Sequence, residues 1–246
     1  MTLLSISNVT KRFGAIQVLN GVNLEIEAGT VTGLVGDNGA GKSTLMKTIT
    51  GIYAIDEGTI TFNGQDVAGL APGERRERGI EMIYQDLALA KQQDVASNIF
   101  LGREPKRRPL GFLPWIVDKT KMDAEARKMI DRLGARIPSV HRPVGLFSGG
   151  QQQTVAIARA LTFNPKLVIM DEPTAALAVR EVESVLNLIK QLKSEGIAVI
   201  LISHRLNDVF EVTDRIVVLR QGRIEANLQT AQTQMREVVS HIVGAH

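Results

Sequence analysis

The segment from Gly36 to Thr44, Gly-Asp-Asn-Gly-Ala-Gly-Lys-Ser-Thr, carries the clearest chemical pattern in the sequence. It follows the short apolar run Val31–Val35 and precedes a predicted helix that starts near Ser43. A glycine, four residues and then Gly-Lys-Ser, between a strand and a helix, is the pattern of a phosphate-binding loop. Its glycines let successive N–H groups point inward, and the helix N-terminus adds positive partial charge. The pattern therefore predicts a site for a nucleoside triphosphate and Mg²⁺.

Within this phosphate loop, each polar side chain has an expected role. Lys42 is expected to reach the β and γ phosphates, and the hydroxyl of Ser43 is expected to ligate Mg²⁺. The alternative is a Gly-rich turn before a helix, which the complete match in a strand, loop and helix context disfavours. The residues predicted to contact the nucleotide are Gly36, Asn38, Gly39, Ala40, Gly41, Lys42, Ser43 and Thr44.

Two carboxylates follow the apolar run Leu167–Met170. A Mg²⁺ nucleotide site needs an acid at the end of a strand that neighbours the strand of the phosphate loop, so Asp171 is the predicted metal partner. Glu172 is then expected to face the γ-phosphate and to orient or deprotonate the attacking water. The alternative is a strand that ends in a polar turn at Pro173.

A second anion site is predicted at Ser148-Gly149-Gly150, which precedes a helical run from Thr154 to Leu161. A hydroxyl and unobstructed N–H groups then lie at a helix N-terminus. One bound nucleotide has little use for two such sites from one chain. We therefore expect a dimer with two sites, in which Ser148–Gly150 of one copy faces the phosphate loop of the other. The alternative for this short pattern alone is an ordinary N-cap loop.

The elements around these residues fall into two kinds. Alternating segments at 3–9, 18–26 and 58–64 predict half-exposed antiparallel strands, and apolar runs at 31–35, 80–84, 167–170 and 198–202 predict strands buried on both faces. Helices are predicted at 119–133, with Asp118 as N-cap and Gly134 as stop, and at 182–192. Two short strands within 215–228 and a helix at 235–243 follow. The predicted fold is an α/β nucleotide-binding core with a mostly parallel sheet, an antiparallel β layer and an inserted α-helical lobe.

Composition narrows the function further. The sequence of 246 residues is 44% hydrophobic and 22% charged, with a net charge of +3, as in an ordinary globular protein. It has no cysteine, which excludes disulfides and thiolate metal sites, and its four histidines show no metal-ligand spacing. No signal peptide and no apolar run long enough for a membrane span is visible, so we expect a cytoplasmic protein. The basic cluster at 103–108 is interpreted as a solvated loop, with a nucleic-acid or lipid head-group patch as the alternative.

These motifs together resemble those of the ATP-binding cassette (ABC) ATPases over essentially the whole chain. The segment Phe147–Gln151, Phe-Ser-Gly-Gly-Gln, matches the family signature with Phe in place of Leu. The resemblance implies that Gln85 touches Mg²⁺ or the attacking water, that His204 contacts the γ-phosphate and that Phe13 stacks on adenine. Without the resemblance, His204 is equally compatible with a core histidine, and Phe13 with a packing residue.

The resemblance also implies an organisation and a catalytic set. The cofactors are ATP and Mg²⁺, with Ser43, Gln85 and Asp171 at the metal and Glu172, His204, Lys42 and Gln85 in catalysis. Signature residues Ser148, Gly149, Gly150 and Gln151 come from the partner copy. One domain spans 1–246, with a RecA-like core and β layer at 1–86 and 163–246 and the helical lobe at 87–162. One departure is Ala178, where the family usually has Asp.

Among ABC proteins, the chain is similar to the ATPase subunits of bacterial monosaccharide importers of the ribose, xylose and fructose type. The segments that carry this similarity are 89–104, 171–177 and 203–210. It implies a head-to-tail homodimer beneath two membrane permease subunits, peripheral on the inner face of the cell membrane, with a periplasmic sugar-binding protein as an indirect partner and no nucleic acid. The alternatives are import of another small solute, or a non-transport ABC ATPase that acts on nucleic acid or ribosomes.

Overall fold

The structure of the protein is a computed structural model that describes residues 1–108, 115–175 and 177–245. The chain divides into two units, one of residues 1–85 and 165–246 and one of residues 86–164. Because both parts of the first unit flank the second in sequence, the second unit is an insertion between strands of the first.

An antiparallel sheet of four strands, in the order β2-β1-β4-β5, lies in the first unit. Its strands are β1 (Thr2–Phe13), β2 (Ile16–Glu27), β4 (Glu57–Phe62) and β5 (Gln65–Asp66). Alternation of apolar and polar residues in β2 buries Val22, Leu24 and Ile26 while the residues between them stay exposed. The predicted antiparallel layer is therefore confirmed.

A second sheet of six strands has the order β12-β11-β3-β10-β9-β6. All neighbouring strands pair in parallel except β12, which pairs antiparallel with β11. The buried strands predicted from continuous apolar runs are all present. The bounds are β3 (Val31–Val35), β6 (Ile80–Ile83), β9 (Leu167–Asp171), β10 (Ala198–Ile202), β11 (Arg215–Arg220) and β12 (Arg223–Gln229).

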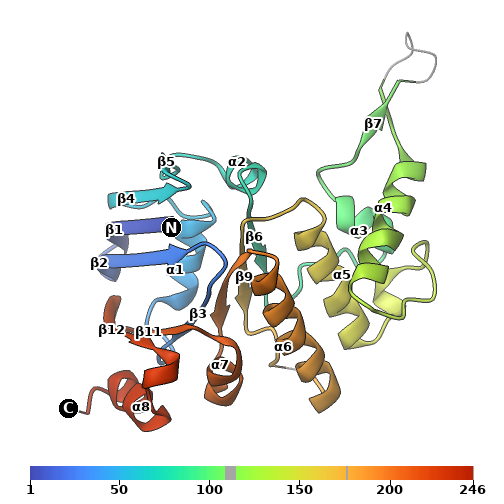
Figure 1. Ribbon diagram of the computed structural model, residues 1–246. Coiled ribbons are helices and arrows are strands. Elements are labelled where there is room, and N and C mark those ends of the chain that lie inside the picture. The colour runs from blue at the N-terminus through green and yellow to red at the C-terminus, as the bar shows by residue number, and fades with distance from the viewer. Residues whose placement is uncertain (109–114, 176, 246) are drawn as a thin grey trace. The chain divides into compact units, whose positions relative to one another are not determined.

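Helix α1 (Lys42–Ile49) lies between the two sheets (Figure 1). Its Leu45, Met46 and Ile49 share one buried core with side chains of both sheets. On the other face of the parallel sheet, α7 (Leu206–Val212) approaches β3 so closely that a Cβ at Gly33 would lie 2.6 Å from Val209 Cγ1. This packing on both faces fixes the ends of β3, and with them the start of the phosphate loop.

The two longer helices that remain in the first unit agree with the predicted ones, whereas its short helical elements were not predicted. The helix predicted at 182–192 is α6 (Val179–Ser194), which buries an apolar stripe that includes Val182, Val185 and Ile189. The terminal helix is α8 (Met235–Val243), and two short elements are α2 (Pro72–Glu77) and a 3₁₀ turn at Thr230–Gln232. Within the described residues, no helix is both long and apolar enough to cross a membrane.

The second unit is mainly helical. It contains α3 (Val95–Phe100), α4 (Lys119–Arg132), a 3₁₀ turn at Val144–Leu146, α5 (Gly149–Leu161) and a small hairpin of β7 (Lys106–Arg107) and β8 (Ile116–Val117). As predicted, Asp118 caps α4 by accepting a hydrogen bond from the Lys121 amide. The core of the unit includes Ile99, Met122 and Val155 from the three helices.

Candidate functional site

The phosphate loop joins the end of β3 to the start of α1, as its sequence pattern predicts. Gly36 has φ of 152°, and a Cβ there would collide with the carbonyl oxygen of Leu219 in β11. The loop therefore passes so close to the neighbouring strand that no side chain fits at this position.

Several amides of this loop are available to an anion. In the described part of the chain, the N–H groups of Gly39, Gly41, Lys42 and Ser43 have no hydrogen-bond partner. The last two belong to the first turn of α1, whose N–H groups lack partners within the helix. A group of unpaired amides at a helix N-terminus fits the oxygens of a phosphate chain.

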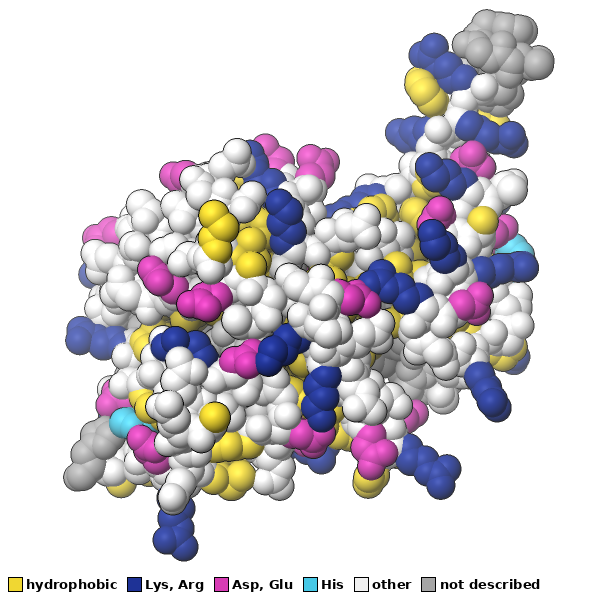
Figure 2. All heavy atoms as spheres, in the orientation of Figure 1, with side chains coloured by type: hydrophobic (Ala, Val, Ile, Leu, Met, Phe, Trp, Pro, Cys, Tyr) yellow, Lys and Arg dark blue, Asp and Glu magenta, His cyan; other side chains and the backbone are white. Residues whose placement is uncertain are grey.

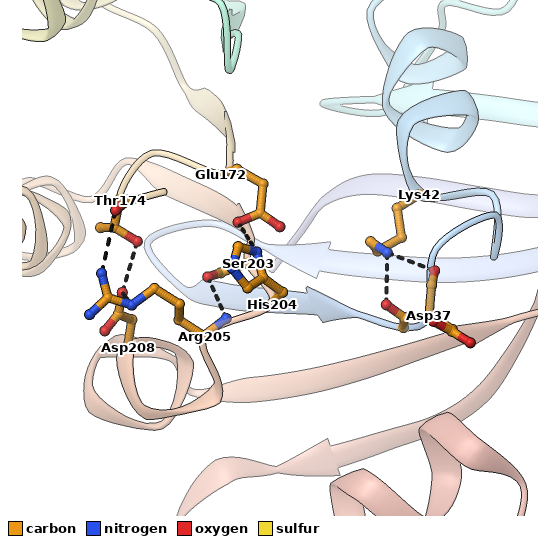
Figure 3. A network of polar contacts seen from close by, with 9 residues as sticks. Asp37, Lys42, Glu172, Thr174, Ser203, His204, Arg205 and Asp208 are labelled. Atoms are coloured by element: carbon orange, nitrogen blue, oxygen red, sulfur yellow. Dashed lines mark hydrogen bonds and ion pairs between the residues drawn. The ribbon is translucent and has the colours of Figure 1, made fainter. Parts of the chain in front are cut away.

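The amine of Lys42 lies over the same loop. Its Nζ donates hydrogen bonds to the carbonyl oxygens of Gly36 at 2.7 Å and Asp37 at 2.9 Å (Figure 3). Burial lowers the pKa of Lys42, while the charges of Glu172, Asp37 and Asp171 partly offset this effect. The cation is thus partly desolvated, which strengthens its attraction to a negative charge placed beside it.

Glu172 and His204 form the most direct contact between predicted catalytic residues. The Glu172 Oε2 atom lies 2.8 Å from His204 Nδ1 (Figure 3). Glu172 is mostly buried, whereas His204 is 69% exposed, so the imidazole remains accessible from solvent. The second reading of His204, as a core histidine, is therefore wrong.

The position of Asp171 requires one correction. We predicted that its strand neighbours the strand of the phosphate loop, but β10 lies between β3 and β9. Sequence order does not reveal strand order, since β10 follows β9 in the chain but lies between β9 and β3 in the sheet. The strand beside β3 is β10, which leads into His204.

A polar network behind this pair was not predicted. Thr174 donates from its hydroxyl to Asp208 Oδ2 at 2.8 Å, and Asp208 lies 3.4 Å from Arg205 Nε. Arg205 also donates from its backbone amide to the hydroxyl of Ser203 (Figure 3). The network ties the loop after β9 to the start of α7, and so holds the backbone on both sides of Glu172 and His204. The only signal in the sequence was the polar cluster 203–208 after an apolar strand.

The predicted metal ligands all follow strands of the parallel sheet. Ser43, Gln85 and Asp171 follow or end β3, β6 and β9, whose carboxyl ends lie at one edge of the sheet. Burial raises the pKa of Asp171 and Glu172 raises it further, whereas Lys42 and Lys47 lower it. Among the described residues, no three His, Asp or Glu side chains are grouped so that they could hold a metal ion. Ser43, Gln85 and Asp171 each carry a side-chain oxygen, and such a set suits Mg²⁺ that is bound together with phosphate oxygens.

Phe13 ends β1 and is 42% exposed, as a stacking surface must be. Its ring packs edge-on against Tyr53, with a centroid distance of 5.1 Å. Lys11 Nζ lies 5.5 Å from the centre of the same ring. Tyr53 was missed in the sequence, although an aromatic residue shortly after the phosphate-loop helix was a visible signal.

The signature segment lies in the second unit at the start of α5. Ser148 is the N-cap: its hydroxyl accepts from the Gln151 amide at 3.3 Å, and the Gln151 side chain accepts from the Ser148 amide. A Cβ at Gly149 would have no atom within 4 Å. Among the described residues, the space beside Gly149 is therefore open.

Ala178 is the N-cap of α6 and carries no side-chain acceptor. Its amide donates to Glu181 Oε2 at 3.1 Å, so only half of a capping box is formed. The carboxylate expected from the resemblance is thus absent at the start of this helix.

Comparison with known proteins places these features in one family. Residues 19–175 match the family described as ABC transporter. The chain is 44% identical to the xylose/arabinose import ATP-binding protein of Sulfolobus acidocaldarius over 96% of this chain and 92% of that protein. It is 41% identical to the ribose import ATP-binding protein of Bacillus licheniformis over 98% of this chain but 48% of that protein. The chain thus spans about half the length of the ribose-import relatives.

Solved structures agree with the sequence comparison. A nucleotide-free ATP-binding cassette from an ABC transporter superposes with a TM-score of 0.82 at 31% identity, covering 99% of this chain and 96% of that one. A dimeric ATP-binding cassette bound to ADP and Pi gives a TM-score of 0.79 at 26% identity, covering 93% of this chain and 99% of that one. The sheet order, the phosphate loop and these matches lead to one conclusion: the chain belongs to the ABC transporter family and has the fold of its ATP-binding cassettes.

Proposed function

We propose that this chain is the ATP-hydrolysing subunit of an importer for a monosaccharide. The observation that carries the proposal is the contact of 2.8 Å between Glu172 and His204, which lies in the same unit as the phosphate loop. Phosphoryl transfer to water requires a carboxylate that can accept a proton from the water and a group that can hold a phosphate oxygen. Glu172 and the imidazole of His204 are such groups.

In the proposed reaction, Phe13 stacks on adenine, with Tyr53 fixing the orientation of its ring. The loop amides and Lys42 bind the phosphates, and Ser43, Gln85 and Asp171 would hold Mg²⁺. When bound, the ion would supply positive charge that offsets the negative charge of the phosphates. Glu172 orients and deprotonates the attacking water, and His204 holds the γ-phosphate. Catalysis arises mainly from positioning and charge neutralisation.

We propose that Ser148, Gly149, Gly150 and Gln151 act on the nucleotide of a second copy. Two observations support a head-to-tail homodimer: the open space at Gly149 and the similarity to a dimeric cassette. Nucleotide binding would then close the dimer, and hydrolysis would reopen it.

The transport role rests on relatives whose names state import of xylose and arabinose or of ribose. We propose that the homodimer works on the inner face of the membrane beneath two permease subunits, and that a periplasmic binding protein delivers the sugar. In this arrangement the sugar never contacts the chain. The second unit would be the helical lobe predicted at 87–162, with residues 86–100 as the surface for a permease helix.

The order around this surface supports that assignment. Arg159 donates hydrogen bonds to the carbonyl oxygens of Leu87 and Ala88, at 2.8 and 2.7 Å. The fully buried Asn98 bonds to Ala90, Gln93 and Asp94. The segment after Gln85 is thus fixed by side-chain bonds, which would let it transmit a movement.

The substitution Glu172→Gln tests the proposal. It keeps the size of the side chain and removes the base, so we expect nucleotide binding to remain and turnover to fall by about 10²–10³. Without hydrolysis, the variant is expected to accumulate as a dimer in Mg-ATP. Size-exclusion chromatography with and without Mg-ATP, together with phosphate release, gives the result. The matched control is Glu183→Gln, an exposed residue of α6. A monomer under both conditions would contradict the dimer, and undiminished turnover would contradict the role of Glu172.

A further inference from the structure

The β7–β8 hairpin of the second unit carries an unusual concentration of cations. Between residues 103 and 121 the sequence has six basic and two acidic residues. Both acids already serve local structure, because Glu104 accepts from the Gly102 amide and Asp118 caps α4. The exposed cations of this basic hairpin are Lys106, Arg107, Arg108, Lys119 and Lys121.

Exposed apolar side chains accompany these cations. Trp115, Ile116 and Val117 are 57%, 43% and 41% exposed. The Arg108 guanidinium lies over the Trp115 ring, 4.6 Å from its centre, so a cation and an aromatic face are adjacent. Figure 2 shows Lys and Arg side chains gathered, with apolar ones among them, where the hairpin projects beyond α3 and α4. The residues that join the strands, 109–114, lie outside the described part of the chain.

The fold of the second unit does not explain these residues. Its core takes apolar side chains from residues 89–100 and 122–163, and among the described residues 101–121 contribute no apolar side chain. Arg103 packs against this core, over the Phe163 ring at 4.4 Å, and is therefore not counted among the exposed cations. A short two-stranded hairpin has little stability of its own. Lys119 and Lys121 also lie in the first turn of α4, beside the N-cap Asp118, where cations oppose the helix dipole. These residue types therefore serve something other than the fold.

We propose that the basic hairpin binds the surface of a membrane that contains anionic lipids. Lys and Arg near such a surface are attracted to the head groups, and tryptophan prefers the boundary between head groups and acyl chains. The exposed Ile116 and Val117 favour lipid over nucleic acid. An aliphatic side chain is stabilised by contact with acyl chains, whereas it can neither hydrogen-bond to a base nor stack on one. The interaction needs neither nucleotide nor a second copy, so it stands independently of the proposed ATPase function.

Trp115 is the only tryptophan of the chain, so its fluorescence reports on the hairpin alone. The purified chain is mixed with vesicles of phosphatidylcholine alone, or of phosphatidylcholine and phosphatidylglycerol in equal amounts. With the anionic vesicles we expect cosedimentation and a blue shift of Trp115 emission, both weakened by salt. With the neutral vesicles we expect binding that is weaker by at least tenfold.

The test variant replaces Lys106, Arg107 and Arg108 by glutamine. Each lost cation is expected to weaken binding about fivefold, and all three together about a hundredfold. The matched control replaces three exposed cations elsewhere, Arg127, Lys128 and Arg236, and is expected to bind like the unchanged chain. A second variant, Trp115→Ser, is expected to reduce cosedimentation without removing charge.

Absence of cosedimentation with anionic vesicles would overturn the proposal, and so would an equal loss of binding in the control variant. Binding of an oligonucleotide without binding of the vesicles would overturn it as well. Gel filtration of each variant at the elution volume of the unchanged chain shows that the fold has survived.

Discussion

Glu172 holds an unfavourable backbone conformation where the chain leaves β9. Its φ is 50°, in the left-handed region that residues with a side chain seldom adopt. Its amide donates to the carbonyl oxygen of Ile202 at 2.9 Å, which links this turn to the end of β10. Such strain costs about 1–3 kcal/mol and persists where the surrounding structure enforces it, often at functional sites. The side chain that leaves this turn lies against His204.

His204 is therefore expected to matter for turnover more than for nucleotide binding. For His204→Ala we expect phosphate release to fall by about 10²–10³ while nucleotide affinity changes little, because the lost contact acts mainly on the transition state. Steady-state turnover and a nucleotide titration measure the two quantities. His141→Ala, at an exposed histidine of the second unit, is the control. A large loss of nucleotide affinity with unchanged turnover would contradict this role.

We expect the charged form of Asp171, the form that binds metal, to lower the stability of the folded chain at neutral pH. Burial and Glu172 raise its pKa above 3.8, so the folded chain disfavours the charged form. Its stabilising contribution is present below pH 3.8 and is lost as the pH rises through the raised pKa. At neutral pH without nucleotide, Asp171→Asn is expected to raise the melting temperature. The side chain is only partly buried, so screening limits the gain to about 1 kcal/mol, or about 2–4 °C.

Melting curves of this variant at neutral pH and below pH 3.8 provide the measurement, since the gain is expected to disappear at the lower pH. Mg²⁺-dependent turnover is expected to fall at the same time. Asp86→Asn, at an exposed carboxylate, is the control and is expected to leave the melting temperature unchanged. Lower stability of Asp171→Asn at neutral pH would show that Asp171 is stabilised in its charged form.

At the scale of elements, the sequence predicted existence and type where periodicity and end signals agreed, but the short elements α2, α7, β7 and β8 were not predicted. For α4, apolar spacing, Asp118 and Gly134 indicated the helix, and the structure has it at Lys119–Arg132. The start of α6 was less clear, because the apolar stripe begins at Val182 while the helix begins at Val179. Ala178, which precedes it, is a residue type that seldom caps a helix, so no start signal was present.

The weak cap at Ala178 leads to a prediction about this helix. Ala178 has φ of −69° and ψ of 158°, the conformation of a normal N-cap residue. An aspartate there could accept from the first amides of α6, and we expect Ala178→Asp to stabilise the chain by about 1 kcal/mol. Urea denaturation measures the change. Ala175→Asp, at an exposed position outside the helix, adds the same charge without a cap. Equal effects of the two substitutions would show that charge alone, and not capping, is responsible.

At the scale of the whole molecule, the sequence could not supply what depends on distant segments. The order β3-β10-β9 and the network of Thr174, Arg205 and Asp208 arise from packing between parts of the chain far apart in sequence. No local pattern encodes such neighbours, because strand order depends on how the helices cover both faces of the sheet. The phosphate loop was predictable because all its chemistry lies in adjacent residues.

At this scale we also expect that a second copy of the chain completes each nucleotide site. Mixing two inactive variants tests this expectation. Lys42→Ala is expected to disable the phosphate loop by weakening nucleotide binding. Gly149→Glu is expected to disable the signature, because it sets a negative charge against the phosphates. The open space at Gly149 accepts the side chain, and an acid in the first turn favours α5, so the fold is preserved.

In a mixed head-to-tail dimer of these variants, one site receives both defects and the other receives none. We therefore expect hydrolysis to recover to about one quarter of the unchanged activity, since half of the dimers are mixed and each has one intact site. Differently tagged chains show that mixed dimers form, and phosphate release measures the recovery. The control mixes Lys42→Ala with a chain that carries both substitutions, for which no intact site exists. Mixed dimers without recovery would mean that each chain uses its own Ser148–Gln151 segment, or that one intact site cannot turn over alone. A tandem fusion of two copies, with Lys42→Ala in one copy only, separates these two explanations. It retains activity if a single intact site can turn over alone.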